Sequence, residues 1–424
     1  MPVDPFERSV RLALDWDCND ARLVAVVEQL LAESFQGRAS NVRKHLKFIL
    51  QHLVRVENYA TDYATSYSRN NNAYRDGIAN PLRLKVRSLK SVIDRLAELG
   101  LVECHMGFND VVTRARLSRV LATQAMRLLM DEHELLSIRS TQLLPHDGVI
   151  LKNVQKQAVW YEETQETRRM KADLSEYNEF IGQQQVEIFN PEVDRPYFLD
   201  AVKSFRIFNN SSFFKGGRFY GPWWETCPKA DRRRITINGE QLVELDYKAN
   251  HVFLLYHLTA TEMPESIRSD PYRWNETIPR DVAKKVFMLA VNCHSETEAW
   301  RSLFQYYSSL TGNIRERWEP YSRCLHYYRM AVGALVRAHP NLQGHIHQGR
   351  GLGLQFMDSQ IAERILLSMT RQSLPTLGIH DSFLIQTRYE AALQEAMEEA
   401  YEFYGVTAGT VPISRTVALP AVAG

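Results

Sequence analysis

An Asn-Gly pair at positions 238 and 239 separates two short stretches in which apolar and polar residues alternate, Arg234–Ile237 and Leu242–Tyr247. Asn-Gly accommodates the positive φ angles of a type I′ turn, and alternation with a period of two is typical of a strand with one buried face. The sequence therefore predicts a tight antiparallel hairpin. A second pair of apolar arms, Leu377–Ile379 and Phe383–Gln386, predicts another hairpin. Such elements favour an antiparallel sheet packed against helices.

Each predicted hairpin carries one acid. Asp246 ends the first hairpin, just before an apolar helical pattern that starts at His251, and Asp381 lies in the polar His-Asp-Ser tip of the second. A rigid strand fixes a catalytic side chain at its end. Two carboxylates on neighbouring strands are the minimum for binding a pair of Mg²⁺ ions together with substrate phosphates. Taken alone, Asp246 has a structural alternative as a helix cap.

A basic helix lies between the two acids in the sequence. Pro279 suits a first helical position, and Arg280 and Lys284 then share one helix face. Such a cationic pair is suited to binding the phosphates of a nucleotide. Without its neighbours, the same pair is typical of a solvated helix surface.

The order of these motifs resembles that in family A DNA polymerases and phage-type single-subunit RNA polymerases. The first matching motif is similar to the Gly-Arg element that contacts template and hybrid in the RNA polymerases. The second is similar to motif A of the DNA polymerases, the third to motif B, and the fourth to motif C of the RNA polymerases. The resemblance covers roughly residues 205 to 405. The four motifs are Gly217-Arg218, Asp246-Tyr247, Arg280 with Lys284, and His380-Asp381-Ser382-Phe383.

This resemblance implies a template-directed nucleic-acid polymerase, a nucleotidyltransferase that adds nucleotides to a 3′-hydroxyl. Its partners are then a DNA template and primer strand, or an RNA product, and nucleoside triphosphates. Asp246 and Asp381 are the implied ligands of two Mg²⁺ ions about 3.5–4 Å apart, for which Mn²⁺ is a possible substitute. The other implied site residues are Arg280, Lys284, Tyr247, His251 and Asn292 for the nucleotide, His380 for the primer end, and Arg218 for the template or primer backbone. Among these, Arg280, Lys284 and His380 also take a catalytic role.

The sequence departs from the family pattern at several motif positions. Asn292-Cys293 replaces the Tyr-Gly that closes motif B, and His251 replaces a glutamate five positions after the first aspartate. Those positions help to choose between ribose and deoxyribose, so the sugar preference stays open. Phe214 stands where the Gly-Arg element has an acid. Short spacings between the motifs imply reduced fingers, at about residues 265–345.

The clearest pattern of the first half is an apolar stripe from Leu89 to Leu96, at helical spacing, that ends at Gly100. Two strand candidates follow, Leu101–His105 and Val111–Arg116. This order resembles a winged helix, whose second helix enters a DNA groove. The alternative is a helical packing domain with a solvated charged face. The basic residues expected to contact nucleic acid are Arg83, Arg87, Lys90, Arg114 and Arg116, with Arg119 just past the second strand.

We expect an α+β protein with a right-hand polymerase palm. Residues 1–150 are predicted as a mainly helical, winged-helix-like nucleic-acid-binding domain, and 151–200 as a connecting, thumb-like helical segment. Residues 201–424 are predicted as the palm, an antiparallel sheet with helices and the small fingers insertion. The alternating charges of Glu162–Glu179 favour a solvent-exposed connecting helix. Glu363 and Arg364 follow Asp358-Ser359 on another predicted helix, where i, i+4 surface pairing is expected.

The charge balance, 51 Lys and Arg against 50 Asp and Glu, argues at first sight against nucleic acid as a partner. The sum averages over basic and acidic regions, whereas a phosphate backbone responds to charges within about 8 Å. No stretch approaches the roughly 20 apolar residues of a membrane span, and the first residues lack an apolar signal region. A cytoplasmic protein without membrane contact is expected. Five scattered cysteines favour neither disulfides nor a zinc site.

Two other functions are compatible with the same residues. A noncatalytic replication-initiation or regulatory protein would use the winged helix and keep a degenerate palm, an alternative that Asn292-Cys293 favours. A template-independent transferase or primer-making enzyme would use the same two acids. The polymerase, from a mobile element or phage-like replicon, is preferred because both aspartates and the basic helix are present.

Overall fold

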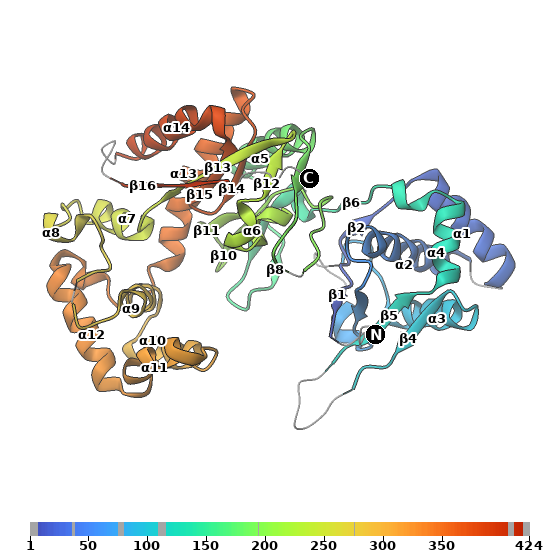
Figure 1. Cartoon of the computed structure of the whole chain (residues 1–424), viewed down its shortest axis with the longest axis horizontal. Coiled ribbons are helices and arrows are strands. Elements are labelled where there is room, and N and C mark those ends of the chain that lie inside the picture. Colours follow the sequence, from blue (N-terminus) through green and yellow to red (C-terminus); the bar gives the residue numbers. More distant parts are fainter. Residues whose placement is uncertain are drawn as a thin grey trace. The chain divides into compact units, whose positions relative to one another are not determined.

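The chain forms two compact units (Figure 1). The first comprises Met1–Gly148, Pro191–Lys203 and Gly221–Thr226, and the second comprises Val149–Asn190, Ser204–Tyr220 and Cys227–Gly424. The stretch 151–200, expected as one connecting segment, is therefore shared between the two units. The computed structural model describes residues 7–35, 39–74, 80–108, 116–193, 195–274, 276–405 and 411–418.

The first unit combines helices with short strands. Its four-stranded sheet has the order β1-β3-β5-β4, in which the β1–β3 pair is parallel and the other pairs are antiparallel. A separate two-stranded pair joins β2 and β6. The elements are β1 (Ser9–Arg11), β2 (Trp16–Asp17), α1 (Ala21–Ser34), α2 (Ala39–Tyr59), β3 (Ala64–Tyr67), η1 (Asn71–Tyr74), α3 (Val86–Glu98), β4 (Val102–His105), β5 (Ser118–Ala122), α4 (Gln124–Glu132) and β6 (Thr141–Gln142).

The apolar stripe predicted around Leu89 is confirmed. Helix α3 buries this stripe against a core shared with α1 and α2, and it ends before Gly100, whose φ is +71°. The first expected strand is observed as β4, which pairs with β5 in the register Val102↔Ala122. The second expected strand, Val111–Arg116, lies outside the described residues except for Arg116 itself. Arg119 lies in β5 and is buried, so, contrary to the prediction, its side chain is not available to contact nucleic acid.

The second unit holds two further sheets and most of the helices. Its elements are β7 (Val149–Lys152), β8 (Ala158–Val159), α5 (Gln165–Gly182), β9 (Val186–Ile188), β10 (Phe205–Asn209), β11 (Ser212–Tyr220), α6 (Lys229–Arg232), β12 (Ile235–Ile237), β13 (Glu240–Tyr247), α7 (Asn250–Leu258), α8 (Glu265–Arg268), α9 (Arg280–Asn292), α10 (Glu296–Tyr307), α11 (Gly312–Arg323), α12 (Leu325–Ala338), α13 (Gly351–Arg371), β14 (Thr376–Ile379), β15 (Ser382–Gln386), α14 (Glu390–Phe403) and β16 (Ile413–Val417).

The larger sheet has the order β14-β15-β13-β12-β9, and β16 also pairs with β13. All of these pairs are antiparallel, so the expected combination of helices with antiparallel sheets is confirmed. The Asn-Gly hairpin is present as predicted: Asn238 and Gly239 join β12 to β13 with φ angles of +52° and +79°. Both values fit the turn that this dipeptide favours.

The two faces of β13 have different roles. Val243, Leu245 and Tyr247 are buried, and the Tyr247 hydroxyl donates to the Met397 carbonyl in α14 at 2.5 Å. Because side chains alternate along a strand, Glu244 and Asp246 share the opposite face, away from α14. The sheet thus holds Glu244 and Asp246 on a rigid strand whose other face is packed in the core.

The smaller sheet has the order β11-β10-β7-β8 and packs with α5 and α13. Helix α5 buries Met170, Leu174, Tyr177 and Ile181, so the expected exposed connecting helix is instead part of this unit's core. The hydroxyl of Tyr177 donates to the Thr376 carbonyl at 3.0 Å. The charge alternation of α5 concealed its apolar stripe.

Helices α9 to α12 form a group with its own apolar core (Figure 1). Helix α9 buries Val282, Ala283, Val286 and Phe287 at helical spacing. Arg280 begins this helix after Pro279, as the sequence predicts. The opposite face of α9 is consequently free to carry its basic residues.

Candidate active site

The structure brings together the two acids that the sequence singles out. Asp246 pairs with Ser382 in the β13–β15 ladder, and Asp381 directly precedes that serine in the β14–β15 turn. The Tyr247 backbone N–H donates to the Asp381 carbonyl at 3.2 Å. Neighbouring strand ends therefore hold Asp246 and Asp381 next to each other.

Burial and neighbouring negative charges act on both carboxyl groups. The pKa of Asp246 is raised to about 7, first by burial and then by the negative charges of Asp381 and Glu244. Burial also raises the pKa of Asp381, and Asp358 adds to the effect. The site therefore favours an added positive charge.

This donor set fits Mg²⁺ better than a transition metal. In the described part of the chain, no group of three or more His, Cys, Asp or Glu side chains is close enough to hold an ion. Mg²⁺ is commonly bound by one or two carboxylates, with waters and substrate phosphates as its other ligands. Asp246 and Asp381 meet that requirement.

Two lysines supply positive charge near Asp246. Both Lys284 in α9 and Lys229 in α6 act to lower the Asp246 pKa against the effect of burial. Lys229 was not predicted, because it lies in a helix of one turn and its only sequence signal is the basic run that follows at 232–234. Both lysines are exposed and accessible to a phosphate.

Arg280 and Lys284 lie on the same side of α9, as predicted. The Arg280 guanidinium and the Lys284 ammonium each lie 5.7 Å from the centroid of the Tyr272 ring. Arg280 is also paired with Asp270, with its Nε 2.6 Å from a carboxylate oxygen. Of the two cations, Lys284 is the one whose charge acts on Asp246.

Gly217 explains how the Gly-Arg element reaches the site. Its φ is +81°, and a Cβ atom there would lie 2.7 Å from the Phe208 ring and 2.8 Å from Ser359 Oγ. Only glycine lets β11 approach α13 this closely. As a result Arg218 donates from Nε to Asp358 at 2.6 Å and from Nη2 to His251 Nε2 at 3.1 Å.

Asp358 is a site residue that the sequence did not reveal. It is 2% exposed and also accepts a hydrogen bond from Asn250 Nδ2 at 2.7 Å. The prediction of surface pairing is wrong for Glu363, which is buried like Asp358 and Ser359, whereas Arg364 is exposed as expected. Arg218, expected to contact nucleic acid, has two of its nitrogens committed to protein groups.

Both histidines of the site are neutral near pH 7. Burial and the charge of Arg218 lower the pKa of His251 to about 4 and that of His380 to about 4. His380 adopts a positive φ of 59° in the β14–β15 turn, and its ring lies edge-on to Tyr220 at 5.6 Å. His380 is therefore fixed beside Asp381 as a neutral hydrogen-bonding group.

Two of the residues expected to contact the nucleotide have side chains that pack against protein groups. Tyr247 is in the core, where its ring contacts Tyr401 with centroids 4.7 Å apart. Asn292 ends α9, about 18 Å along the helix from Arg280 at 1.5 Å per residue. Its side chain packs so closely on Gly351 that a Cβ atom there would lie 2.2 Å from Asn292 Oδ1. Asn292 therefore supports the start of α13.

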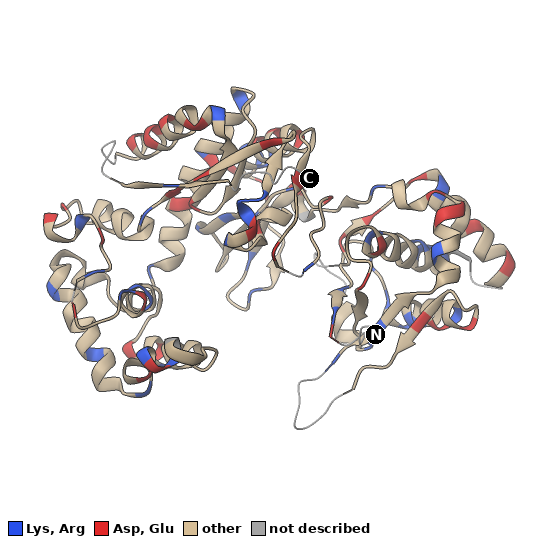
Figure 2. Ribbon diagram, in the orientation of Figure 1, with Lys and Arg blue, Asp and Glu red and all other residues tan. Residues whose placement is uncertain are grey.

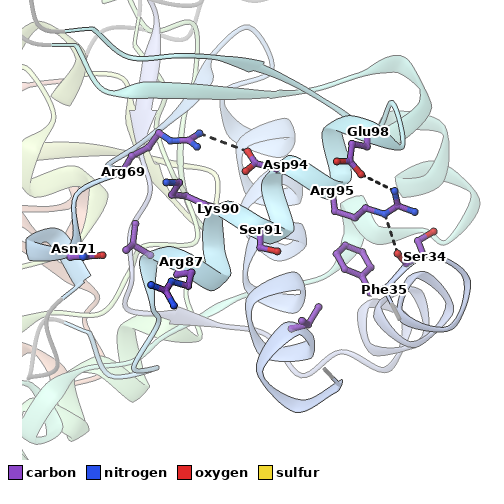
Figure 3. Close-up of a pocket in the computed structure, with 12 residues that line it drawn as sticks. Ser34, Phe35, Arg69, Asn71, Arg87, Lys90, Ser91, Asp94, Arg95 and Glu98 are labelled. Atoms are coloured by element: carbon purple, nitrogen blue, oxygen red, sulfur yellow. Dashed lines mark hydrogen bonds and ion pairs between the residues drawn. The ribbon is translucent and has the colours of Figure 1, made fainter. Parts of the chain in front are cut away.

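The first unit has a cavity of about 860 Å³ on the exposed side of α3, shown in Figure 3. Arg69 pairs with Asp94 at 3.8 Å, and Arg95 pairs with Glu98 at 2.8 Å. Arg87 and Lys90 also line the cavity, and neither has an ion-pair partner among the residues that the structure describes. The remaining predicted contacts are Arg83, which is exposed, Arg116, and Arg114, which lies outside the described residues.

No model of a protein family matches the sequence, and no curated protein matches it. One similar solved structure is the POL domain of Pol1 from M. smegmatis in complex with DNA primer-template and dNTP. Its TM-score is 0.31 at 13% identity, with 93% of this chain and 72% of that chain covered. Within the described residues, no helix has the length and apolar character needed to cross a membrane.

Proposed function

We propose that this protein is a nucleotidyltransferase that extends a nucleic-acid 3′-hydroxyl from nucleoside triphosphates under the direction of a DNA template. The observation that carries the proposal is the pair Asp246 and Asp381, held on neighbouring strand ends under mutual repulsion. Such a pair destabilises the folded protein unless a cation binds it, and the exposed Lys284 and Lys229 are near enough to bind phosphates.

Each side chain of the site has a part in this chemistry. Asp246 and Asp381 would hold Mg²⁺, which when bound lowers the pKa of the attacking hydroxyl and neutralises phosphate charge. Lys284 and Lys229 would bind the triphosphate and stabilise the charge that develops on the departing pyrophosphate. Neutral His380 would orient the primer end by a hydrogen bond. Asp358 would hold Arg218 in place beside Asp381.

In this proposal the parts of a polymerase correspond to the observed elements. The sheet of β12 to β16 with α13 and α14 is the palm, and residues 265–345 are the reduced fingers. The α3–β4–β5 segment is a winged-helix-like element that binds duplex DNA through the Arg87 and Lys90 side of α3. A noncatalytic DNA-binding protein is the competing function, and it predicts DNA binding without synthesis.

Primer extension tests the proposal directly. The full chain is incubated with Mg²⁺, a labelled primer-template, and either dNTPs or NTPs. We expect extension with at least one nucleotide set and none with Asp381→Asn. Extension without template would assign an untemplated transferase. DNA binding without any extension would assign the noncatalytic alternative.

The α3 face is tested separately by binding. Replacing both Arg87 and Lys90 with alanine is expected to weaken duplex DNA binding on the order of tenfold and to lower the salt slope by about 2, since two phosphate contacts are lost. Fluorescence anisotropy at several salt concentrations measures both quantities. Arg139→Ala, an exposed arginine of the same unit that does not line the cavity, serves as the control. An unchanged salt slope in the double variant would contradict the assignment.

A further inference from the structure

The end of the β10–β11 hairpin exposes an aromatic ring. Phe214 is 75% exposed, whereas its neighbour Phe213 turns inward and contacts Tyr161 and Phe208 at centroid distances of 5.0 and 5.1 Å. The Phe214 ring is nevertheless held, because Phe356 of α13 packs edge-on against it at 5.7 Å. An ordered ring with an open face results.

Three lysines lie on the segments that meet at this hairpin. Lys215 follows Phe214 and is exposed, and Lys156 lies in the exposed turn between β7 and β8. The end of β7 reaches the same hairpin, since the Ser211 N–H donates to the Lys152 carbonyl at 2.8 Å. Burial, and then the charge of Lys156, lower the pKa of Lys152, so these two ammonium groups are close. Among the described residues, none of the three lysines has a carboxylate partner.

The exposed ring lies on the same strand as residues of the candidate active site. Phe214 precedes Arg218 by four residues on β11, at most about 13 Å at 3.3 Å per residue. Tyr220, two residues further along the same strand, contacts His380 beside Asp381. One strand therefore leads from the acid pair to the exposed ring.

A single aromatic face with unpaired lysines fits single-stranded nucleic acid. Every base has a π-face that stacks on an aromatic side chain, and the phosphates between bases require nearby positive charge. A protein partner would instead require a larger apolar core patch. Singly exposed apolar side chains are common, so it is the lysines and the fixed ring that distinguish this one.

We propose that Phe214, Lys215, Lys152 and Lys156 form a platform that binds an unpaired nucleic-acid strand, with one base stacked on Phe214 and the lysines on its phosphates. The inference rests on the proposed function and assigns it a path for the single strand.

Binding of a labelled oligo(dT) strand, measured by anisotropy without nucleotides, tests the platform. Phe214→Ala is expected to weaken binding about 5- to 100-fold, because stacking on an aromatic side chain contributes about that much per base. Phe214→Trp should retain the affinity, and Lys215→Ala should weaken it with a smaller salt slope. The matched control is Phe403→Ala, a 63% exposed phenylalanine on α14. One face of its ring is covered by the Arg364 guanidinium, 3.8 Å from the centroid, and the charges of α14 itself are all acidic (Figure 2).

The platform would be contradicted if Phe214→Ala bound oligo(dT) as tightly as the wild type, or if Phe403→Ala lost as much affinity as Phe214→Ala. Primer extension in the wild type separates this from the proposed function. A protein that extends primers while Phe214→Ala binds normally retains its function and lacks the platform. A protein that loses oligo(dT) binding in Phe214→Ala but never extends a primer has the platform and is not a polymerase.

Discussion

Replacing Asp246 with asparagine is expected to abolish nucleotide addition and, in the same protein, to raise the melting temperature measured without metal. Loss of a metal ligand removes several kcal/mol of transition-state stabilisation, and each 1.4 kcal/mol is about tenfold, so a loss of about a thousandfold or more is expected. Stability changes in the opposite direction. The introduced amide would carry no charge to be repelled by Asp381 and Glu244.

The stability gain follows from the raised pKa. Asp246 ionises near pH 3.8 in the unfolded chain and near 7 in the folded one, so its contribution to stability falls as pH rises from about 4 to 7 and is constant above that. A tenfold difference in acid dissociation between the folded and unfolded chain corresponds to about 1.4 kcal/mol, which solvent screening reduces. We expect Asp246→Asn to raise the free energy of unfolding at pH 8 by about 1–2 kcal/mol, and the melting temperature by about 2–8 °C.

Thermal unfolding at two pH values checks this prediction. Wild type and Asp246→Asn should melt alike at pH 4, and the variant should melt higher at pH 8. Added Mg²⁺ should raise the melting temperature of the wild type and leave the variant unchanged. Glu262→Gln, an exposed acid of the same unit, is the control and should alter neither melting nor activity. A pH-independent difference would mean that Asp246 is not repelled in the folded state.

Local signals account for what the sequence predicted correctly. The turn at Asn238-Gly239 and the strand around it depend on neighbouring residues only, so dipeptide chemistry and alternation were sufficient. The same alternation places Tyr247 in phase with buried Val243 and Leu245. That alternation indicates a core tyrosine, whereas the resemblance to the polymerases implied that Tyr247 contacts the nucleotide.

Long-range pairs account for what the sequence did not reveal. Arg218 and Asp358 are 140 residues apart in the chain, and Arg206 and Glu363 are 157 apart. Nothing near Asp358 indicates that β11 will approach α13 there. Helix α13 is packed by β11, α5, α7 and α14 on several sides, so its polar residues are buried where a simple amphipathic pattern assigns them to solvent.

Substitutions in the buried pair of Arg206 and Glu363, which lies behind the Gly-Arg element, should be among the most destabilising in the chain. Arg206 is 0% exposed, and its Nη1 donates to Glu363 Oε1 at 2.5 Å while its Nε donates to the Gly217 carbonyl at 2.8 Å. Burial lowers the pKa of Arg206, and the charge of Glu363 opposes that effect. Glu363→Gln keeps the shape but leaves a buried cation uncompensated, at a cost of about 3–5 kcal/mol in the free energy of unfolding.

Urea or thermal unfolding of two glutamate variants distinguishes this buried pair from an exposed one. Glu296→Gln breaks the exposed pair with Arg329, whose Nη2 lies 2.8 Å from the carboxylate, and should cost less than about 1 kcal/mol. Replacing both partners, as Arg206→Met with Glu363→Leu, should recover most of the loss, because no uncompensated charge remains. Equal costs for the two single glutamate variants would show that Arg206 is hydrated in the folded protein. Stability recovered by the double replacement should not restore nucleotide addition, since the bond from Arg206 to Gly217 that places Arg218 beside Asp381 is still missing.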